Sequence, residues 1–380
     1  MVHAFAKYGV HPTPAMERAM AMNPEYHNLT RRAGVTGDVV AFPQKNDMQY
    51  LSPVKIGTPP QTLYVAIDTG SADFWVMSPS TLPRHPPGQA LYTPSASTTS
   101  RLLPNYTWSI LYADRSTARG NVYRDHVTLG NTLHLPSHPI EHATHVSPSF
   151  APPLSGLLGL GPSHSNRIRA PRNITTTGPP VLTVLDALLP SLPLPLFTAD
   201  LKAQSPGTFS FGRIPPASHL GSLGYTKLTP PRSPYWQFTV SGWSVGDRPG
   251  RGVGSAFTAI ADTGTSLALL PRTVVDAYWA RVPGAGFEAR WGGVVFPCEA
   301  ELPDWSFWVG AGEDGKGWKG TVPGRYMRYG RVNGTGCFGG MQSGEGVGFG
   351  VLGDVVLKAV LVVFDVGGGR VGFGRKRLVK

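Results

Sequence analysis

The sequence predicts an all-β protein built from two lobes, with few short helices. Its 380 residues are two to three times the length of an average domain. Hydrophobic residues make up 41% and charged residues only 15%, which excludes a disordered chain or a coiled coil. The 47 glycines and 37 prolines show no collagen repeat and separate short apolar segments, a pattern typical of turn-rich β structure.

The chain divides into three parts. Residues 1–45 are rich in Ala, Met and His and are expected to be a propeptide-like leader, with an amphipathic helical stretch over residues 15–22. From Met48 onward, short apolar segments predict strands, most clearly over residues 64–67, 108–112, 121–123, 208–211 and 360–364. The clearest helices are expected over residues 181–189 and 271–282, the second with Pro271 in its first turn. Proline-rich bends place the boundary near Pro215, so residues 46–215 and 216–380 are predicted to form an N-terminal and a C-terminal β lobe.

Composition and charge narrow the classes of function. The formal charge of +11 would suit a polyanion-binding surface protein. However, the basic residues are spread thinly and no nucleic-acid-binding motif accompanies them, so we expect scattered solvated charge and no nucleic-acid partner. Two cysteines are too few for a tetrahedral zinc site, and we expect no metal or cofactor. The longest apolar runs are strand-sized, so no membrane span is expected.

The most informative feature is a four-residue motif that occurs once in each half of the chain. Each copy follows an apolar strand and consists of Asp, Thr, Gly and a hydroxyl residue: residues 68–71 and residues 262–265. On a tight loop, the glycine N–H and the hydroxyl side chain can hydrogen-bond the carboxylate. An ordinary Asx turn would explain a single copy. Two copies instead indicate two similar lobes that each contribute one Asp.

These motifs resemble those of the pepsin-like aspartic proteases, most of all the secreted fungal enzymes, and the likeness extends over residues 48–376. Further segments resemble the family independently: residues 74–76, 157–161, 235–238, 296–298, 337–340, 351–354, 363–365 and 370–373. The resemblance implies a bilobal pepsin-like fold. It also implies an aspartic-type endopeptidase that hydrolyses peptide bonds at acidic pH.

The resemblance assigns roles to the repeated motif. Asp68 and Asp262 would be the catalytic pair. Two close carboxylates share one proton, so one can take a proton from a bound water while the other protonates the scissile carbonyl oxygen. The remaining motif residues would hold the carboxylates or tie the two loops together: Thr69, Gly70, Ser71, Thr263, Gly264 and Thr265. The alternative is that these residues merely cap turns.

A hairpin around Tyr112 resembles the family's flap, which closes over substrate. By resemblance, Trp75 would hydrogen-bond or pack with Tyr112, and Asp114 would contact a basic side chain next to the cleaved bond. The alternative for Tyr112 is a buried strand aromatic. The tip departs from the family pattern, because Ala113 and Arg115 stand where the family has glycines. A positive φ at Arg115 would add strain, and its charge would pair with Asp114 or change substrate preference.

Further resemblances concern the cysteines and the leader. Cys298 and Cys337 would form the family's second-lobe disulfide, the alternative being two free thiols. A disulfide implies an oxidising compartment, and four glycosylation sequons are consistent with secretion: Asn28, Asn105, Asn173 and Asn333. We therefore expect a secreted or vacuolar glycoprotein, although no signal peptide is present in this chain.

In the leader, Lys7 and Tyr8 resemble propeptide residues that occupy the closed cleft, where the Lys7 ammonium would pair with the aspartates until acid releases it. The alternative is a solvated lysine in a loose terminus. The sequence thus predicts a monomeric zymogen, inhibited by its own propeptide, that acts on proteins or peptides and binds pepstatin-type inhibitors. The rival hypotheses are a catalytically inactive pepsin-like binding protein and, less favoured, a polyanion-binding protein.

Overall fold

The computed structural model describes residues 34–83, 86, 88–169, 181–246, 254–310, 317–332 and 334–378. Several positions singled out from the sequence lie outside these residues: the helical stretch 15–22, Lys7, Tyr8, Asn28, Asn173 and Asn333.

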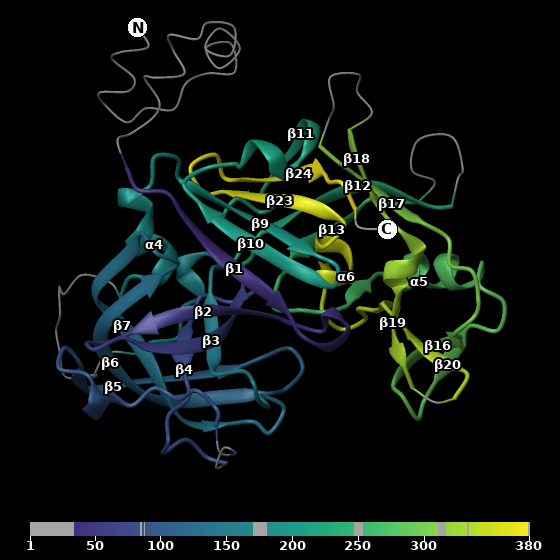
Figure 1. The fold of residues 1–380 in the computed structure, drawn as a ribbon. Coiled ribbons are helices and arrows are strands. Elements are labelled where there is room, and N and C mark those ends of the chain that lie inside the picture. Colours follow the sequence, from purple (N-terminus) through teal and green to yellow (C-terminus); the bar gives the residue numbers. More distant parts are fainter. Residues whose placement is uncertain are drawn as a thin grey trace, which may run out of the picture.

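The largest sheet has thirteen strands and runs through both halves of the chain. Its first six strands are antiparallel neighbours in the order β11-β24-β23-β9-β10-β1. Figure 1 shows them spanning the region between the two lobes. Their bounds are β1 (Gly37–Pro43), β9 (Leu196–Lys202), β10 (Ser205–Phe211), β11 (Leu220–Lys227), β23 (Val360–Asp365) and β24 (Arg370–Arg375).

The same sheet continues into the N-terminal lobe in the order β2-β3-β8-β4-β7-β6-β5. These strands are β2 (Tyr50–Ile56), β3 (Gln61–Asp68), β4 (Phe74–Val76), β5 (Arg101–Leu111), β6 (Thr117–Leu129), β7 (Leu133–Val146) and β8 (Gly156–Gly159). Strand β5 therefore lies at the edge of the sheet. The five strands expected from the sequence fall within β3, β5, β6, β10 and β23, except that Tyr112 lies one residue beyond β5.

The C-terminal half adds two sheets of its own. A seven-stranded sheet has the order β18-β17-β12-β13-β22-β14-β21, and a four-stranded sheet has the order β15-β16-β20-β19. Their bounds are β12 (Gln237–Val245), β13 (Phe257–Ala261), β14 (Ala268–Leu270), β15 (Gly286–Glu288), β16 (Gly293–Pro297), β17 (Trp305–Val309), β18 (Trp318–Val322), β19 (Arg328–Arg331), β20 (Gly336–Gly339), β21 (Met341–Ser343) and β22 (Gly350–Leu352).

The two lobes repeat one local strand arrangement. In the N-terminal lobe, β8 is parallel to β3 and antiparallel to β4, and β4 is parallel to β7. In the C-terminal lobe, β22 is parallel to β13 and antiparallel to β14, and β14 is parallel to β21. Every residue of β8 and β22 is buried, which explains why these short strands are continuous apolar runs with glycine. The all-β, bilobal prediction is confirmed.

Glycine lets β8 pack directly behind the first motif. A Cβ atom on Gly159 would lie 2.6 Å from both the Asp73 nitrogen and the Ser71 carbonyl oxygen. In the other lobe, a Cβ on Gly353 would overlap the Thr265 and Leu267 carbonyl oxygens. Each motif loop therefore rests on a strand end that only glycine allows to approach so closely.

Helix is sparse among the described residues. It comprises α4 (Val184–Leu188), α5 (Arg272–Trp279), α6 (Asp354–Leu357) and short 3₁₀ turns. α4 starts after the expected residue 181 because Thr183 is its N-cap and accepts a hydrogen bond from the Asp186 N–H. In α5, Pro271 is the N-cap rather than a first-turn residue, and the helix ends before residue 282. α5 buries one face, formed by Val274, Val275, Tyr278 and Trp279.

Part of the expected leader is built into the body of the protein. Residues 37–43 form β1, which pairs with β10 and β2, and its Val39 and Ala41 side chains are buried. Between the lobes, Pro215 falls between β10 and β11, within a sheet to which both halves contribute. We still propose boundaries at residues 45 and 215. The segment that forms β1 nevertheless pairs with β2 and β10 of the N-terminal lobe.

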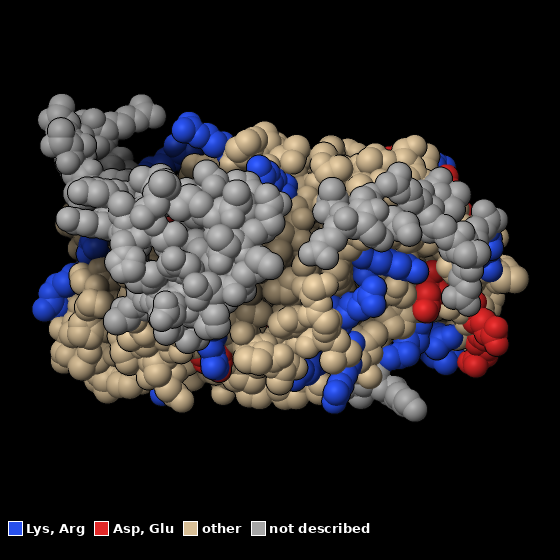
Figure 2. Space-filling view, turned by 90° about the horizontal axis from the view of Figure 1, so that it is seen from above, with Lys and Arg blue, Asp and Glu red and all other residues tan. Residues whose placement is uncertain are grey.

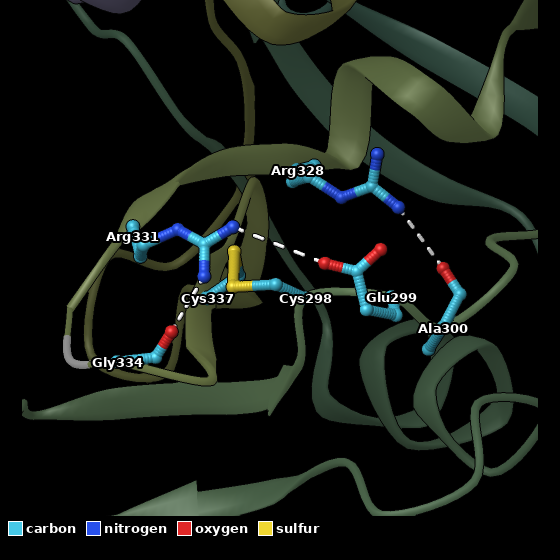
Figure 3. Close-up of a disulfide and its surroundings, with 7 residues drawn as sticks. All are labelled: Cys298, Glu299, Ala300, Arg328, Arg331, Gly334 and Cys337. Atoms are coloured by element: carbon cyan, nitrogen blue, oxygen red, sulfur yellow. Dashed lines mark hydrogen bonds and ion pairs between the residues drawn. A yellow bond between two sulfur atoms is a disulfide. The ribbon is translucent and has the colours of Figure 1, made fainter.

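Cys298 and Cys337 form a disulfide that joins the end of β16 to β20 (Figure 3). Beside it, Arg331 donates a hydrogen bond to the Gly334 carbonyl oxygen and lies 3.9 Å from Glu299, while Arg328 donates to the Ala300 carbonyl oxygen. The disulfide and the polar contacts of the two arginines thus connect neighbouring segments of the C-terminal lobe.

Basic side chains occur at several separate places on the face shown in Figure 2, with carboxylates gathered mainly at one end. In the part of the chain that the structure describes, no helix is long and apolar enough to cross a membrane.

Candidate active site

The two repeated motifs meet at the junction of the lobes. Asp68 is the last residue of β3, and Asp262 directly follows β13. Both are nearly buried, with 5% and 8% of their surfaces exposed. Because β3 and β13 occupy corresponding places in the two repeated strand arrangements, the fold brings the two carboxyl groups together.

Each carboxyl group is held by its own loop. Asp68 accepts hydrogen bonds from the Gly70 N–H at 2.8 Å and the Ser71 hydroxyl at 2.5 Å. Asp262 accepts the equivalent bonds from the Gly264 N–H at 2.8 Å and the Thr265 hydroxyl at 2.6 Å. Such donors fix the orientation of each carboxyl group and favour its ionised form.

The two threonines cross-link the loops. The Thr69 hydroxyl donates to the Ala261 carbonyl oxygen at 2.8 Å and accepts from the Thr263 N–H at 3.0 Å. The Thr263 hydroxyl donates to the Ile67 carbonyl oxygen at 2.6 Å and accepts from the Thr69 N–H at 3.2 Å. Four hydrogen bonds related by approximate two-fold symmetry therefore fix one carboxyl group relative to the other.

The motif glycines are required by the opposite carboxyl group. A Cβ on Gly70 would lie 2.6 Å from Asp262 Oδ1, and a Cβ on Gly264 would overlap Asp68 Oδ1. Any larger residue at either position would therefore push the pair apart.

The electrostatics of the pair favour one shared proton. Burial, followed by the charge of the neighbouring Asp262 carboxyl group, raises the pKa of Asp68. The Ser71 and Gly70 donors oppose this rise. A pair with one proton has an acid and a base side by side, which suits activation of a water molecule.

The structure also brings together the expected flap residues. The Trp75 Nε1–H donates to the Tyr112 hydroxyl at 2.7 Å, and the Tyr112 ring meets the edge of Phe150 at 5.6 Å between centroids. Tyr112 is partly buried beside an apolar cluster that includes Trp75, Trp108 and Ile110. Tyr112 begins a tight turn that is closed by hydrogen bonds with Arg115 and Ser116.

The tip of this turn has the anticipated backbone strain. Arg115 has a φ of 67°, in the left-handed region that favours glycine. Asp114 does not depend on Arg115 for its partner, because one of its carboxylate oxygens accepts from the Ser116 N–H at 2.9 Å and from the Ser116 hydroxyl at 2.6 Å. Both Asp114 and Arg115 are exposed, so their charges are accessible to solvent.

Three acidic residues near the pair were not identified from the sequence: Asp73, Glu141 and Asp354. Burial and the charge of Asp262 raise the pKa of Asp354, whereas Lys358 lowers it. Asp354 lies within the family-like segment 351–354 and Asp73 directly precedes the segment 74–76, but neither was assigned a role in the site. Glu141 gave no local signal, because it reaches the site only through the pairing of β7 with β4. Within the described residues, no group of three or more His, Cys, Asp or Glu side chains could hold a metal ion.

Comparison with known proteins identifies the family. The model of the eukaryotic aspartyl protease family matches residues 49–376. Endothiapepsin of Cryphonectria parasitica is 41% identical over 95% of this chain and 82% of its own, and podosporapepsin of Podospora anserina is 39% identical over 98% and 86%. The fold is similar to that of the aspartic proteinase from Irpex lacteus, with a TM-score of 0.71 and 22% identity over 90% of this chain and 98% of that one. The resemblance inferred from the motifs is confirmed, and the chain belongs to the eukaryotic aspartyl protease family.

Proposed function

We propose that this aspartic protease is an endopeptidase, made as a zymogen, that cleaves proteins or peptides at acidic pH through Asp68 and Asp262. The observation that supports this most strongly is the close approach of two buried carboxyl groups, each held by one N–H and one hydroxyl of its own loop. The close relatives with pepsin-type names support the same assignment.

In the proposed reaction, a water molecule lies between the two carboxyl groups. One group, as base, takes a proton from the water while the other, as acid, protonates the carbonyl oxygen of the scissile peptide. The product is a neutral tetrahedral diol, and no covalent bond to the enzyme forms. Transfer of a proton to the amide nitrogen then lets the C–N bond break, giving a carboxylic acid and an amine. At high pH the shared proton is lost and the acid is missing, which restricts the reaction to acidic conditions.

The Tyr112 hairpin is proposed to cover the bound peptide. An extended peptide in a cleft between lobes would be held mainly through its backbone, with side-chain pockets giving selectivity. The exposed Asp114 would attract a basic substrate side chain, and Arg115 would oppose it. Arg115 would therefore shift the preference of the enzyme from substrates with a basic side chain beneath the flap toward substrates with an acidic one.

The leader is proposed to inhibit the enzyme before activation. The Lys7 ammonium would pair with the two aspartates at neutral pH, and protonation of carboxylates in acid would weaken that pairing. Mass spectrometry after acid treatment tests this proposal. The leader should be lost from the parent protein but retained in Asp68→Asn, and Lys7→Ala should lose it at a higher pH. A parent leader that stays intact after hours at about pH 3 would contradict the zymogen proposal.

Secretion and a monomeric state are also part of this proposal. The disulfide suits an oxidising compartment, and the exposed Asn105 sequon could then carry a glycan. Relatives named for fungal pepsins support the same location.

The deciding experiment is cleavage of denatured globin between about pH 2.5 and about pH 7, with and without pepstatin. Asp68→Asn and Asp262→Asn should each abolish cleavage, while the exposed Asp276→Asn should retain it. Acid-dependent cleavage that survives either dyad substitution would overturn the proposed mechanism. No cleavage by the parent, even after removal of the leader, would favour an inactive pepsin-like binding protein.

A further inference from the structure

A second pair of acidic side chains lies beneath the flap hairpin. Asp73, just before β4, and Glu141, on β7, have exposed fractions of 0% and 1%. The parallel pairing of β4 with β7 places Trp75 opposite Glu141 and so brings the two acidic residues together. The reaction proposed above uses neither of them.

The contacts of this pair imply a shared proton. Asp73 Oδ1 accepts from the Arg167 N–H at 2.6 Å, and Glu141 Oε1 accepts from Asn166 Nδ2 at 3.4 Å. The other two oxygens, Asp73 Oδ2 and Glu141 Oε2, are buried and receive no donor from the described residues. An ionised carboxylate only accepts hydrogen bonds, so a proton held by one of the two carboxyl groups would supply the donor that these buried oxygens lack.

The charges around the pair keep that proton in place. Burial is the main cause that raises the pKa of both groups, and the charge of Asp73 raises the pKa of Glu141 further. The Arg167 side chain opposes this for Asp73, and the Asn166 amide opposes it for Glu141. From the flap side, the neighbouring titratable group is the Tyr112 hydroxyl, whose pKa is itself raised by burial. In the part of the chain that the structure describes, the Arg167 charge lowers the pKa of Asp73 without reversing the effect of burial.

The pair is connected to the flap through residues 166–169. Asn166 and Arg167 bind the two carboxyl groups, and Asn166 Nδ2 also donates to the Ala72 carbonyl oxygen at 3.2 Å. Ile168 packs against the apolar cluster that contains Trp75 and Trp108. Arg169 then forms two backbone hydrogen bonds with Thr107 of β5, at 2.8 and 3.2 Å. Strand β5 leads directly to Tyr112, so the anchor lies five residues before the flap tyrosine.

We propose that Asp73 and Glu141 are a proton-sharing positioning pair that anchors residues 166–169 to the flap strand β5, so that loss of the shared proton loosens the flap as the pH rises. The proposal rests on the proposed function only in treating the Tyr112 hairpin as the flap. The enzyme would then have a second site that depends on a bound proton, separate from Asp68 and Asp262, and this site would lose its proton as the pH rises toward neutral.

The sign of the pH effect follows from proton binding. Above the ordinary pKa of a glutamate the unfolded chain has released this proton, whereas the folded protein still holds it. The unfolding free energy therefore falls as the pH rises, until the folded pair also ionises. In Glu141→Gln, the amide is a permanent donor to Asp73. The shared proton is then no longer needed, and it no longer contributes to the pH dependence of the unfolding free energy.

The experiment uses the full chain with Asp68→Asn, which prevents self-digestion and removes titration of Asp68. Into this parent we would introduce Glu141→Gln, Asp73→Asn, Glu141→Leu and, as a matched control, the exposed Glu288→Gln. Urea unfolding at several pH values gives the slope of the unfolding free energy against pH. Amide hydrogen exchange of residues 107–112 gives the order of the flap strand.

With Glu141→Gln, the slope should become shallower by up to one proton, and exchange of β5 at about pH 7 should slow about tenfold relative to the parent. Asp73→Asn should act in the same direction, because Asn still accepts from Arg167 and now donates to Glu141. Glu141→Leu should speed exchange even in acid, and Glu288→Gln should match the parent.

Two results would overturn the proposal. An unchanged slope in both Glu141→Gln and Asp73→Asn would mean that the pair holds no proton. A changed slope with unchanged exchange of β5 would mean that the pair does not position the flap. Neither readout requires catalysis, so failure of the globin assay would count against the proposed protease function and not against this pair.

Discussion

Thr69 and Thr263 determine how the carboxyl groups of Asp68 and Asp262 face each other. Each hydroxyl is buried and both donates and accepts across the lobe junction. Valine has nearly the same shape as threonine but can make neither bond. A single Thr→Val change would thus leave one N–H and one carbonyl group of the opposite loop without partners in a dry environment.

We expect Thr69→Val to lower the unfolding free energy by about 2–4 kcal/mol, because the Thr263 N–H and the Ala261 carbonyl lose their partners. The turnover number should fall as well, since the Asp262 loop is then less firmly positioned. Urea unfolding and kcat on one peptide measure the two effects. The exposed Thr98→Val should cost less than about 0.5 kcal/mol. Equal behaviour of the two variants would contradict the cross-link.

Arg115 combines strain and charge at the tip of the flap. At a φ of 67°, replacement by glycine removes the strain, whereas replacement by alanine removes only the charge. We expect Arg115→Gly to be more stable than Arg115→Ala by about 1 kcal/mol in urea unfolding. A change in KM that is common to both variants would be due to the loss of the Arg115 charge, because both variants lack it. Equal stabilities would show that the turn relaxes without glycine.

At the scale of single residues, the sequence was informative wherever a motif repeated. Both Asp-Thr-Gly copies and the contact of Trp75 with Tyr112 could be expected from it, and the loss of the tip glycine at Arg115 marked the position where the structure has a positive φ. Glu141 could not, because its meeting with Asp73 depends on strand pairing between distant segments.

At the scale of elements, β4 and the hairpin after β5 are joined by the hydrogen bond between Trp75 and Tyr112. A double-mutant cycle of Trp75→Phe and Tyr112→Phe isolates this bond from the packing that each change also disturbs. We expect a coupling of about 0.5–1.5 kcal/mol in kcat/KM, with each single variant less active than the parent. Trp308→Phe, on the remote strand β17, should combine additively with Tyr112→Phe. Coupling in the control cycle, or none in the first, would contradict the contact.

The disulfide fixes β16 relative to β20 across a sequence separation of 39 residues. For a loop of this length, the chain-entropy model gives a stabilisation of about 4 kcal/mol. We expect Cys298→Ala/Cys337→Ala to lose about that much in urea unfolding without reductant. A reducing agent should destabilise the parent and leave the double variant unchanged. An equal response of the two proteins would argue against the bond.

Local pattern predicted strand interiors better than element ends. The strands over residues 64–67, 208–211 and 360–364 are alternating or continuous apolar segments, and all lie inside observed strands. The helix expected over residues 271–282 is shorter at both ends, because Pro271 provides the N-cap instead of the first turn and the helix already ends at Trp279. β1 was missed, since Gly37–Pro43 was assigned to the leader and pairs with β10, far along the chain.

At the scale of the whole molecule, burial of acidic groups makes the folded state bind protons more tightly than the unfolded chain. Burial raises the pKa of Asp68, Asp73, Glu141 and Asp354. In contrast, hydrogen bonds from Thr99, Ser97, Tyr92 and His126 lower the pKa of Asp125, so its contribution is present above the ordinary pKa of an aspartate and lost in stronger acid. The buried acids therefore lower the unfolding free energy as the pH rises, whereas Asp125 lowers it in stronger acid.

The last prediction tests this balance at Asp68. Its pKa in the unfolded chain is about 3.8 and is raised in the folded protein by burial and by Asp262, so stability should decline as the pH rises above that value. An asparagine side chain at this position cannot lose a proton, and its amide can donate to Asp262. We therefore expect Asp68→Asn to exceed the parent in unfolding free energy by about 1–3 kcal/mol at about pH 7, and the difference to shrink in acid.

Urea unfolding followed by tryptophan fluorescence, repeated at several pH values, measures this difference. The exposed Asp276→Asn is the matched control and should follow the parent at every pH, because its carboxylate is two-thirds exposed. If Asp68→Asn were instead less stable than the parent at neutral pH, the ionised carboxylate would be the preferred form in the folded protein. The two aspartates would then be held apart strongly enough to ionise independently, and a shared proton could not limit the enzyme to acid.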